Sequence, residues 1–175
     1  AKSGHALDSD RAIQFLVNKA MANHAVRVEP TYDKRLVQLF ALLTLELAMS
    51  GTDVFPVFDN ECLWKGVTCN GTVVTELEYG RLGWTGSIPS EIGLLQNLTK
   101  LDASNNALSG SIPEALYTLT NLEQDFLYQN QLTCTLSASI GDLNQINYWH
   151  LSHNQLSRSI PSTLKLGAKI CPLRK

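Results

Sequence analysis

The chain has 175 residues, a formal net charge of −2 and a hydrophobic content of 44%, which is sufficient for one continuous core. This near-neutral charge, with an isoelectric point of about 6.1, argues against a protein that binds nucleic acid or an anionic membrane, because both require a basic surface. No apolar run reaches the ~18 residues of a membrane-spanning helix, so direct membrane insertion is not expected.

Two helices are predicted before the first repeat. Residues 8–25 carry apolar side chains at the spacing of a single helical stripe, at Ile13, Leu16, Val17, Ala20 and Met21. Pro30 interrupts this segment, since proline disfavours helix in the residue before it. A second helix is expected to start at Thr31 or Asp33 and to end at Met49.

From residue 65 onward, the chain repeats its chemistry every 24 residues. Apolar side chains occupy three registers and asparagine a fourth: Val74, Leu98, Leu122 and Ile146; Ile88, Ile112, Leu136 and Ile160; Ile92, Leu116, Ile140 and Leu164; and Asn106, Asn130 and Asn154. A fixed period of this length is typical of a solenoid, in which each unit buries its apolar face on its neighbours. We therefore expect a broad surface rather than a deep pocket.

Within each unit, the pattern L-x-x-L-x-L-x-x-N-x-L predicts a short strand with one buried face and a turn at the asparagine. The asparagine amides should bond to neighbouring backbone groups and form a ladder when the units stack. The segment S-G-S-I-P at 109–113 then turns the chain to the convex side, where residues 114–119 are expected to form a short helical or 3₁₀ turn.

Two segments carry a resemblance to a known family. Residues 98–113 and 146–161 closely resemble plant-type leucine-rich repeats with their L-x-G-x-I-P extension, and residues 62–69 resemble the C-x-W-x-G-V-x-C cap that precedes such repeats in extracellular plant and algal proteins. The resemblance implies an α/β solenoid. This is a right-handed leucine-rich-repeat coil with short parallel strands on the concave face, 3₁₀ or helical turns on the convex face and an N-terminal helical cap.

The chain is accordingly divided into four parts. We expect an N-terminal helical extension at 1–30, which has no counterpart in the family, and a helical, disulfide-bonded cap at 31–69. About four leucine-rich repeats follow at 70–160, and residues 161–175 form a partial C-terminal repeat.

The four cysteines fall into two groups. The resemblance implies a disulfide between Cys62 and Cys69 that closes the open apolar end of the solenoid; the alternative is two free thiols in a reducing compartment. Cys134 stands at the position of Gly86, Gly110 and Arg158, and Cys171 at that of Thr99, Glu123 and Asn147. These positions lie on different parts of the coil, so no Cys134–Cys171 bond is expected unless the tail folds back.

A disulfide indicates an extracellular location, or alternatively an organelle lumen such as the thylakoid lumen. The alanine at position 1 is typical of a processed chain from which a targeting segment was removed. The motifs Asn70-Gly71-Thr72 and Asn97-Leu98-Thr99 match the acceptor pattern for N-glycosylation, which makes Asn70 and Asn97 candidate sites; the second also arises from the repeat consensus itself.

Outward-facing strand residues should form columns across the concave face: Glu78, Asp102, Phe126 and His150; Gly80, Ser104, Tyr128 and Ser152; Glu76, Lys100, Gln124 and Tyr148; and Arg81, Asn105, Gln129 and His153. No packing rule requires aromatic residues there, and such residues often anchor protein interfaces. We therefore predict a partner-binding surface comprising Asp102, Phe126, Tyr128, Tyr148, His150 and His153, although scattered exposed aromatics are also ordinary.

Two other interpretations of this face stay open. The acidic end, Glu76, Glu78 and Asp102, either meets a basic partner or is a solvated surface. His150 and His153 have no cysteine or carboxylate at ligand spacing, so contact or solvent-exposed residues are expected rather than a metal site.

One repeat departs from its neighbours. Asp125 occupies the inward position that Leu77, Leu101 and Trp149 hold elsewhere, and burial of an unpaired carboxylate is costly. Either Asp125 finds partners, or its strand is distorted, or a bound partner holds this repeat in place. Trp149, on the next strand, is expected to fill the space that a leucine in place of Asp125 would have taken.

These features indicate a non-catalytic leucine-rich-repeat module that binds a protein partner and needs no cofactor. No nucleophile elbow, phosphate loop or zinc spacing is present, and the carboxylate pair Glu78 and Asp102 would lack an enclosed cleft. One alternative is a structural accessory subunit, docked through residues 1–30 on a larger complex such as a lumenal membrane complex. The resemblance also implies a further alternative, an inhibitor of a cell-wall polysaccharide-degrading enzyme.

Overall fold

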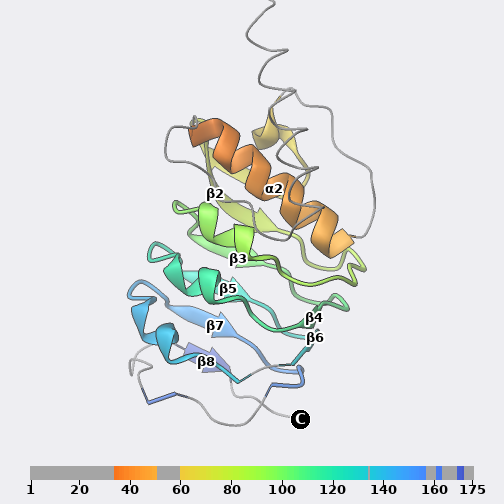
Figure 1. The fold of residues 1–175 in the computed structure, drawn as a ribbon, viewed down its shortest axis with the longest axis vertical. Coiled ribbons are helices and arrows are strands. Elements are labelled where there is room, and N and C mark those ends of the chain that lie inside the picture. Colours follow the sequence, from red (N-terminus) through yellow and green to blue (C-terminus); the bar gives the residue numbers. More distant parts are fainter. Residues whose placement is uncertain (1–33, 51–59, 134, 157–160, 163–168, 172–175) are drawn as a thin grey trace, which may run out of the picture.

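Each repeat of the sequence forms one coil, with a short strand on one side and a 3₁₀ turn on the other, and the coils stack from α2 at one end to β8 at the other (Figure 1). The computed structural model describes residues 34–50, 60–133, 135–156, 161–162 and 169–171. The predicted helix at 8–25, the extension at 1–30 and Cys134 lie outside the described residues.

The described elements follow the predicted order along the chain. They are α2 (Lys34–Ser50), η1 (Glu61–Leu63), β1 (Val67–Asn70), β2 (Val73–Glu78), η2 (Ser90–Leu94), β3 (Lys100–Asp102), β4 (Ser109–Gly110), η3 (Glu114–Thr118), β5 (Gln124–Phe126), β6 (Gln131–Leu132), η4 (Ala138–Asp142), β7 (Tyr148–His150) and β8 (Lys169–Cys171). The 3₁₀ turns η2, η3 and η4 recur once per repeat, and η3 confirms the turn predicted at 114–119.

Six strands form one sheet in the order β1-β2-β3-β5-β7-β8. The β1–β2 pair is an antiparallel hairpin, and the other pairs are parallel. The register aligns Leu77, Leu101, Asp125 and Trp149 across four neighbouring strands, so the 24-residue period of the sequence is also the register of the sheet. The short strands β4 and β6 pair in a second, parallel sheet.

The last strand differs from the predicted register. His150 pairs with Cys171, so the final unit advances by 21 residues rather than 24. Cys171 therefore stands in the column of Asp102, Phe126 and His150, not at the position of Asn147, which was the prediction. The assignment was wrong because the 24-residue period was extended into a tail in which the turn asparagine of the repeats does not recur.

The core is a continuous apolar column along the stack. The described members of the three predicted apolar registers are buried, for example Val74, Leu98 and Leu122, except that Ile146 is only partly buried. The asparagine register joins successive coils: Asn106 accepts the backbone N–H of Leu82 at 3.0 Å and donates to a carbonyl of the preceding coil. Asn130 and Asn154 repeat this arrangement, which confirms the predicted ladder.

Helix α2 covers the first coil and buries its own apolar face, including Phe40, Leu42 and Leu45. Its last carbonyls bond to the first repeat, because Met49 O accepts the N–H groups of Thr85 and Gly86. A Cβ at Gly86 would lie 1.7 Å from the carbonyl oxygen of Ala48, so only glycine permits this close approach. No helix in the described part of the chain is both long and apolar enough to cross a membrane.

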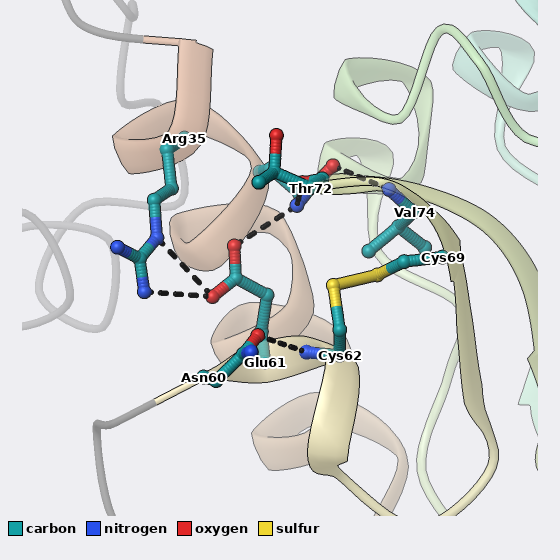
Figure 2. Close-up of polar contacts among 8 residues, drawn as sticks. Arg35, Asn60, Glu61, Cys62, Cys69, Thr72 and Val74 are labelled. Carbon is teal, nitrogen blue, oxygen red and sulfur yellow. Dashed lines mark hydrogen bonds and ion pairs between the residues drawn. A yellow bond between two sulfur atoms is a disulfide. The ribbon is translucent and has the colours of Figure 1, made fainter.

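Polar contacts join α2 to the hairpin (Figure 2). The buried carboxylate of Glu61 accepts from Arg35 at 3.3 Å and from Gln38 at 3.0 Å. Gln38 also donates to the carbonyl of Thr72 at 3.1 Å and accepts the N–H of Val74 at 2.7 Å. The expected disulfide between Cys62 and Cys69 joins η1 to β1 of the hairpin, and its Cα atoms lie 5.6 Å apart.

Candidate functional site

The outer face of the sheet is built by alternation within very short strands. The central residue of β3, β5 and β7 points into the core, and its two neighbours face outward. The parallel register therefore aligns two outward columns: Lys100, Gln124 and Tyr148, and Asp102, Phe126 and His150. We call this surface, from β2 to β7, the open face.

Four aromatic rings lie together on β5, β7 and the residues that follow them. We call Phe126, Tyr128, Tyr148 and His150 the aromatic patch. The rings of Tyr128 and His150 stack at 4.3 Å between centroids, with 24° between their planes. Tyr148 is 45% exposed, and the other three are partly buried. The structure thus brings together four of the six residues predicted to bind a partner.

In the Tyr128–His150 stack, the imidazole ring is also held by a polar contact. His150 Nε2 lies 2.7 Å from the hydroxyl oxygen of Ser152. Partial burial lowers the pKa of His150 below its usual value, and the neighbouring His153 lowers it further. His150 is therefore uncharged near pH 7, which suits a surface that contacts another aromatic or apolar group.

The other two predicted residues have different surroundings. Asp102 is partly buried, and its Oδ1 accepts the N–H of Ser104 at 2.9 Å, so this carboxylate also stabilises the turn after β3. His153 is exposed on the turn after β7, with a φ of 56° that the equivalent residues of the other coils share.

Two residues predicted to be exposed are buried. Ser104 and Ser152 lie within the turns that follow β3 and β7, where the chain bends away from the face. The bend occurs at the next residue, Asn105 or His153, which adopts the left-handed conformation. The prediction extended the alternation of inward and outward residues beyond the strand, but this alternation holds only within the strand.

The acidic end of the open face is partly neutralised. Lys100 forms an ion pair with Glu78, and this hydrogen bond raises the pKa of Lys100 although slight burial opposes the rise. Glu76 and Asp102 raise it further by charge attraction. One cation therefore compensates part of the negative charge contributed by three carboxylates.

Asp125 lies beneath the aromatic patch and is fully buried. Its Oδ2 accepts the indole N–H of Trp149 at 2.8 Å, whereas its Oδ1 has no hydrogen-bond partner within the described structure. Burial raises the pKa of Asp125 to about 7; the Trp149 hydrogen bond lowers it, and the charge of Asp102 raises it further. Asp125 therefore has one partner, Trp149, and the regular register shows that its strand is not distorted.

Trp149 fills the core beside this carboxylate. Its ring meets that of Tyr117 edge-on at a centroid distance of 6.4 Å. In the described ranges, no group of three or more His, Cys, Asp or Glu side chains is placed to hold a metal ion.

A polar groove that the sequence did not predict runs along the amino-terminal ends of the strands. Its volume is about 590 Å³, and it is lined by Asn70, Val73, Thr75, Asn97, Thr99, Asn121, Glu123 and Gln145. The 24-residue spacing of Asn97, Asn121 and Gln145, just before each strand, is the sequence signal that could have revealed it.

The Leucine Rich Repeat family model matches residues 97–119. The LRR receptor-like serine/threonine-protein kinase GSO2 of Arabidopsis thaliana is 47% identical over 47 residues, which are 27% of this chain and 4% of GSO2. The chain therefore matches only a small part of that relative.

Solved structures extend the likeness over most of the fold. The BIR2 ectodomain from Arabidopsis thaliana has a TM-score of 0.66 and 28% identity, covering 75% of this chain and 72% of that one. The LRR ectodomain of the plant membrane receptor kinase GASSHO1/SCHENGEN3 has a TM-score of 0.66 and 36% identity, covering 75% of this chain and 16% of that one. The SOBIR1 ectodomain has a TM-score of 0.59 and 27% identity, with 67% of each chain covered. The fold is thus a leucine-rich-repeat solenoid of the kind found in plant receptor ectodomains.

Proposed function

We propose that this chain is a non-catalytic protein-binding module that recognises a protein or peptide partner through its open face. The observation that carries the proposal is the aromatic patch, in which four rings gather on β5, β7 and the segment that follows β5. The GASSHO1/SCHENGEN3 ectodomain was solved in complex with CASPARIAN STRIP INTEGRITY FACTOR 2, and that of HAESA with an IDA peptide hormone. Both relatives support a macromolecular partner.

The patch has the physical properties of an interface anchor. Aromatic rings supply large contact areas and lose little side-chain entropy on binding, because they have few rotatable bonds. The Tyr128–His150 stack already restrains two of the rings, so less ordering remains for the bound state. Tyr148 offers the most exposed ring, and we assign it the first contact with the partner.

We place this module outside the cell. The Cys62–Cys69 disulfide indicates an oxidising compartment, and the similar solved structures are receptor ectodomains. An organelle lumen, such as the thylakoid lumen, is the alternative location. There the module would be an accessory subunit docked on a larger complex.

Affinity capture from native extract tests the proposal. Wild-type protein, a Phe126→Ala/Tyr128→Ala double variant and a Thr120→Ala control are immobilised in equal amounts. Thr120 is exposed on the turn after η3, outside the strands that form the open face. Quantitative mass spectrometry should identify proteins that wild type and control retain and the double variant loses, after circular dichroism has shown that all three are folded.

If wild type, double variant and control capture the same proteins, the aromatic patch has no role in partner binding. Size-exclusion chromatography of native extract addresses the alternative function. Constant co-elution with one large assembly would favour an accessory subunit over a module that binds its partner reversibly.

A further inference from the structure

The tip of the β1–β2 hairpin presents a sugar-acceptor motif to solvent. Asn70 pairs with Val73 and closes a two-residue turn of Gly71 and Thr72. Asn70, Gly71 and Thr72 are all exposed, and a Cβ at Gly71 would meet nothing within 4 Å. Both groups that the acceptor pattern requires, the amide of Asn70 and the hydroxyl of Thr72, are therefore accessible in the folded protein.

The backbone at the hairpin tip is held in place, although the side chains of Asn70 and Thr72 are exposed. The disulfide joins Cys69, the residue before Asn70, to Cys62. Gln38 of α2 donates to the carbonyl of Thr72 and accepts the N–H of Val74. These contacts use the backbone of the turn and leave the Thr72 side chain unengaged, so a large group on Asn70 would not disturb them.

Asn70 also stands at one end of the polar groove. Amide and hydroxyl side chains dominate its lining, and these groups both donate and accept hydrogen bonds, as sugar hydroxyls do. Its volume of about 590 Å³ is within the usual range for small-molecule sites. Val73, next to the tip, is 37% exposed and would be covered by a group that leaves Asn70 along the groove.

From these observations we propose that Asn70 carries an N-linked oligosaccharide whose first sugars lie along this groove. The inference rests on the extracellular location proposed above. Its consequence is that the glycan occupies the flank at the amino-terminal ends of the strands. A protein partner then approaches the open face over the aromatic patch and not over this flank.

The second motif is less available in the folded chain. Asn97 is exposed on the rim of the same groove, but the Thr99 hydroxyl is partly buried and donates to the carbonyl of Thr75 at 3.0 Å. Asn97→Gln is therefore measured beside Asn70→Gln, so that each acceptor is scored separately.

The test is the intact mass of the full chain secreted from a eukaryotic host, before and after peptide-N-glycosidase F. Asn70→Gln and Thr72→Ala should each lose the mass of one glycan relative to wild type. Thr68→Ala changes an exposed threonine of the same hairpin without touching the motif and should keep the glycan. If both variants are secreted with the wild-type glycan mass, the proposal is wrong. If Asn70→Gln is not secreted, the mass of Thr72→Ala decides.

Carboxyl footprinting tests the position of the sugars. Glu123 lines the groove, and Asp142 is exposed on η4. Enzymatic removal of the glycan should increase labelling of Glu123 at least about twofold and leave Asp142 unchanged. Equal labelling of Glu123 in both forms would overturn the groove position. Partner capture through the aromatic patch is a separate measurement, so failure of the glycan proposal leaves the proposed function standing.

Discussion

Replacement of the buried carboxylate of Asp125 should change how stability depends on pH. Because burial raises the pKa of Asp125 from 3.8 to about 7, the folded state holds the proton more tightly than the unfolded state. The contribution of this group is therefore full below about pH 4 and is lost as pH rises through about 7. The gap between the two pKa values corresponds to about 4 kcal/mol of unfolding free energy.

Asp125→Asn removes the charge at every pH and keeps an oxygen for the indole N–H of Trp149. The unfolding free energy of the variant minus that of wild type should therefore rise by about 4 kcal/mol between pH 4 and pH 8. Urea unfolding followed by tryptophan fluorescence measures this difference. Asp142→Asn, on an exposed turn, is the matched control.

A constant difference between Asp125→Asn and wild type across this pH range would refute the reasoning. It would show that Asp125 is ionised in the folded protein at low cost. A partner for its second oxygen, Oδ1, would then have to exist.

Three further predictions concern the scaffold. Replacement of Cys62 and Cys69 by serine should lower the unfolding free energy by about 2.5 kcal/mol and make thermal unfolding insensitive to dithiothreitol; an unchanged midpoint would mean that the bridge adds no stability. Asn130→Ala removes three buried hydrogen bonds, two of them between coils, and should cost about 3 kcal/mol in urea unfolding, whereas a cost under about 0.5 kcal/mol would contradict a stabilising ladder. Gly66→Ala should cost more than about 2 kcal/mol, because its Cβ would lie 2.4 Å from a carbonyl oxygen of β2 and its φ is +84°. Gly71→Ala, also at positive φ but in open space, should cost only about 1 kcal/mol in the same assay, and equal costs would argue against the steric reason.

The repeat register was predictable because it depends on local spacing. The positions of Leu101 and Asn106 recur at a spacing of 24 residues, so one period determines strand, turn and ladder together. The outward columns follow from the same register, which is why Phe126 and His150 were correctly placed side by side.

Features that depend on contacts between distant segments were not predictable. The partner of Asp125 is a tryptophan 24 residues away, and either outcome for this residue was consistent with the sequence. Burial of Glu61 depends on Arg35 and Gln38 of α2, which no spacing rule connects to it. The polar groove left a signal in the 24-residue spacing before the strands, but its continuation to the β1–β2 hairpin lies outside that spacing.

Site-specific photo-cross-linking measures directly which surface meets the partner. A photoreactive phenylalanine analogue is placed at Tyr148, on the open face, or at Thr120, on the turn after η3. Irradiation in native extract should give a covalent adduct with the captured partner from position 148 and none from position 120. An adduct from position 120 alone would show that partners bind elsewhere on the solenoid.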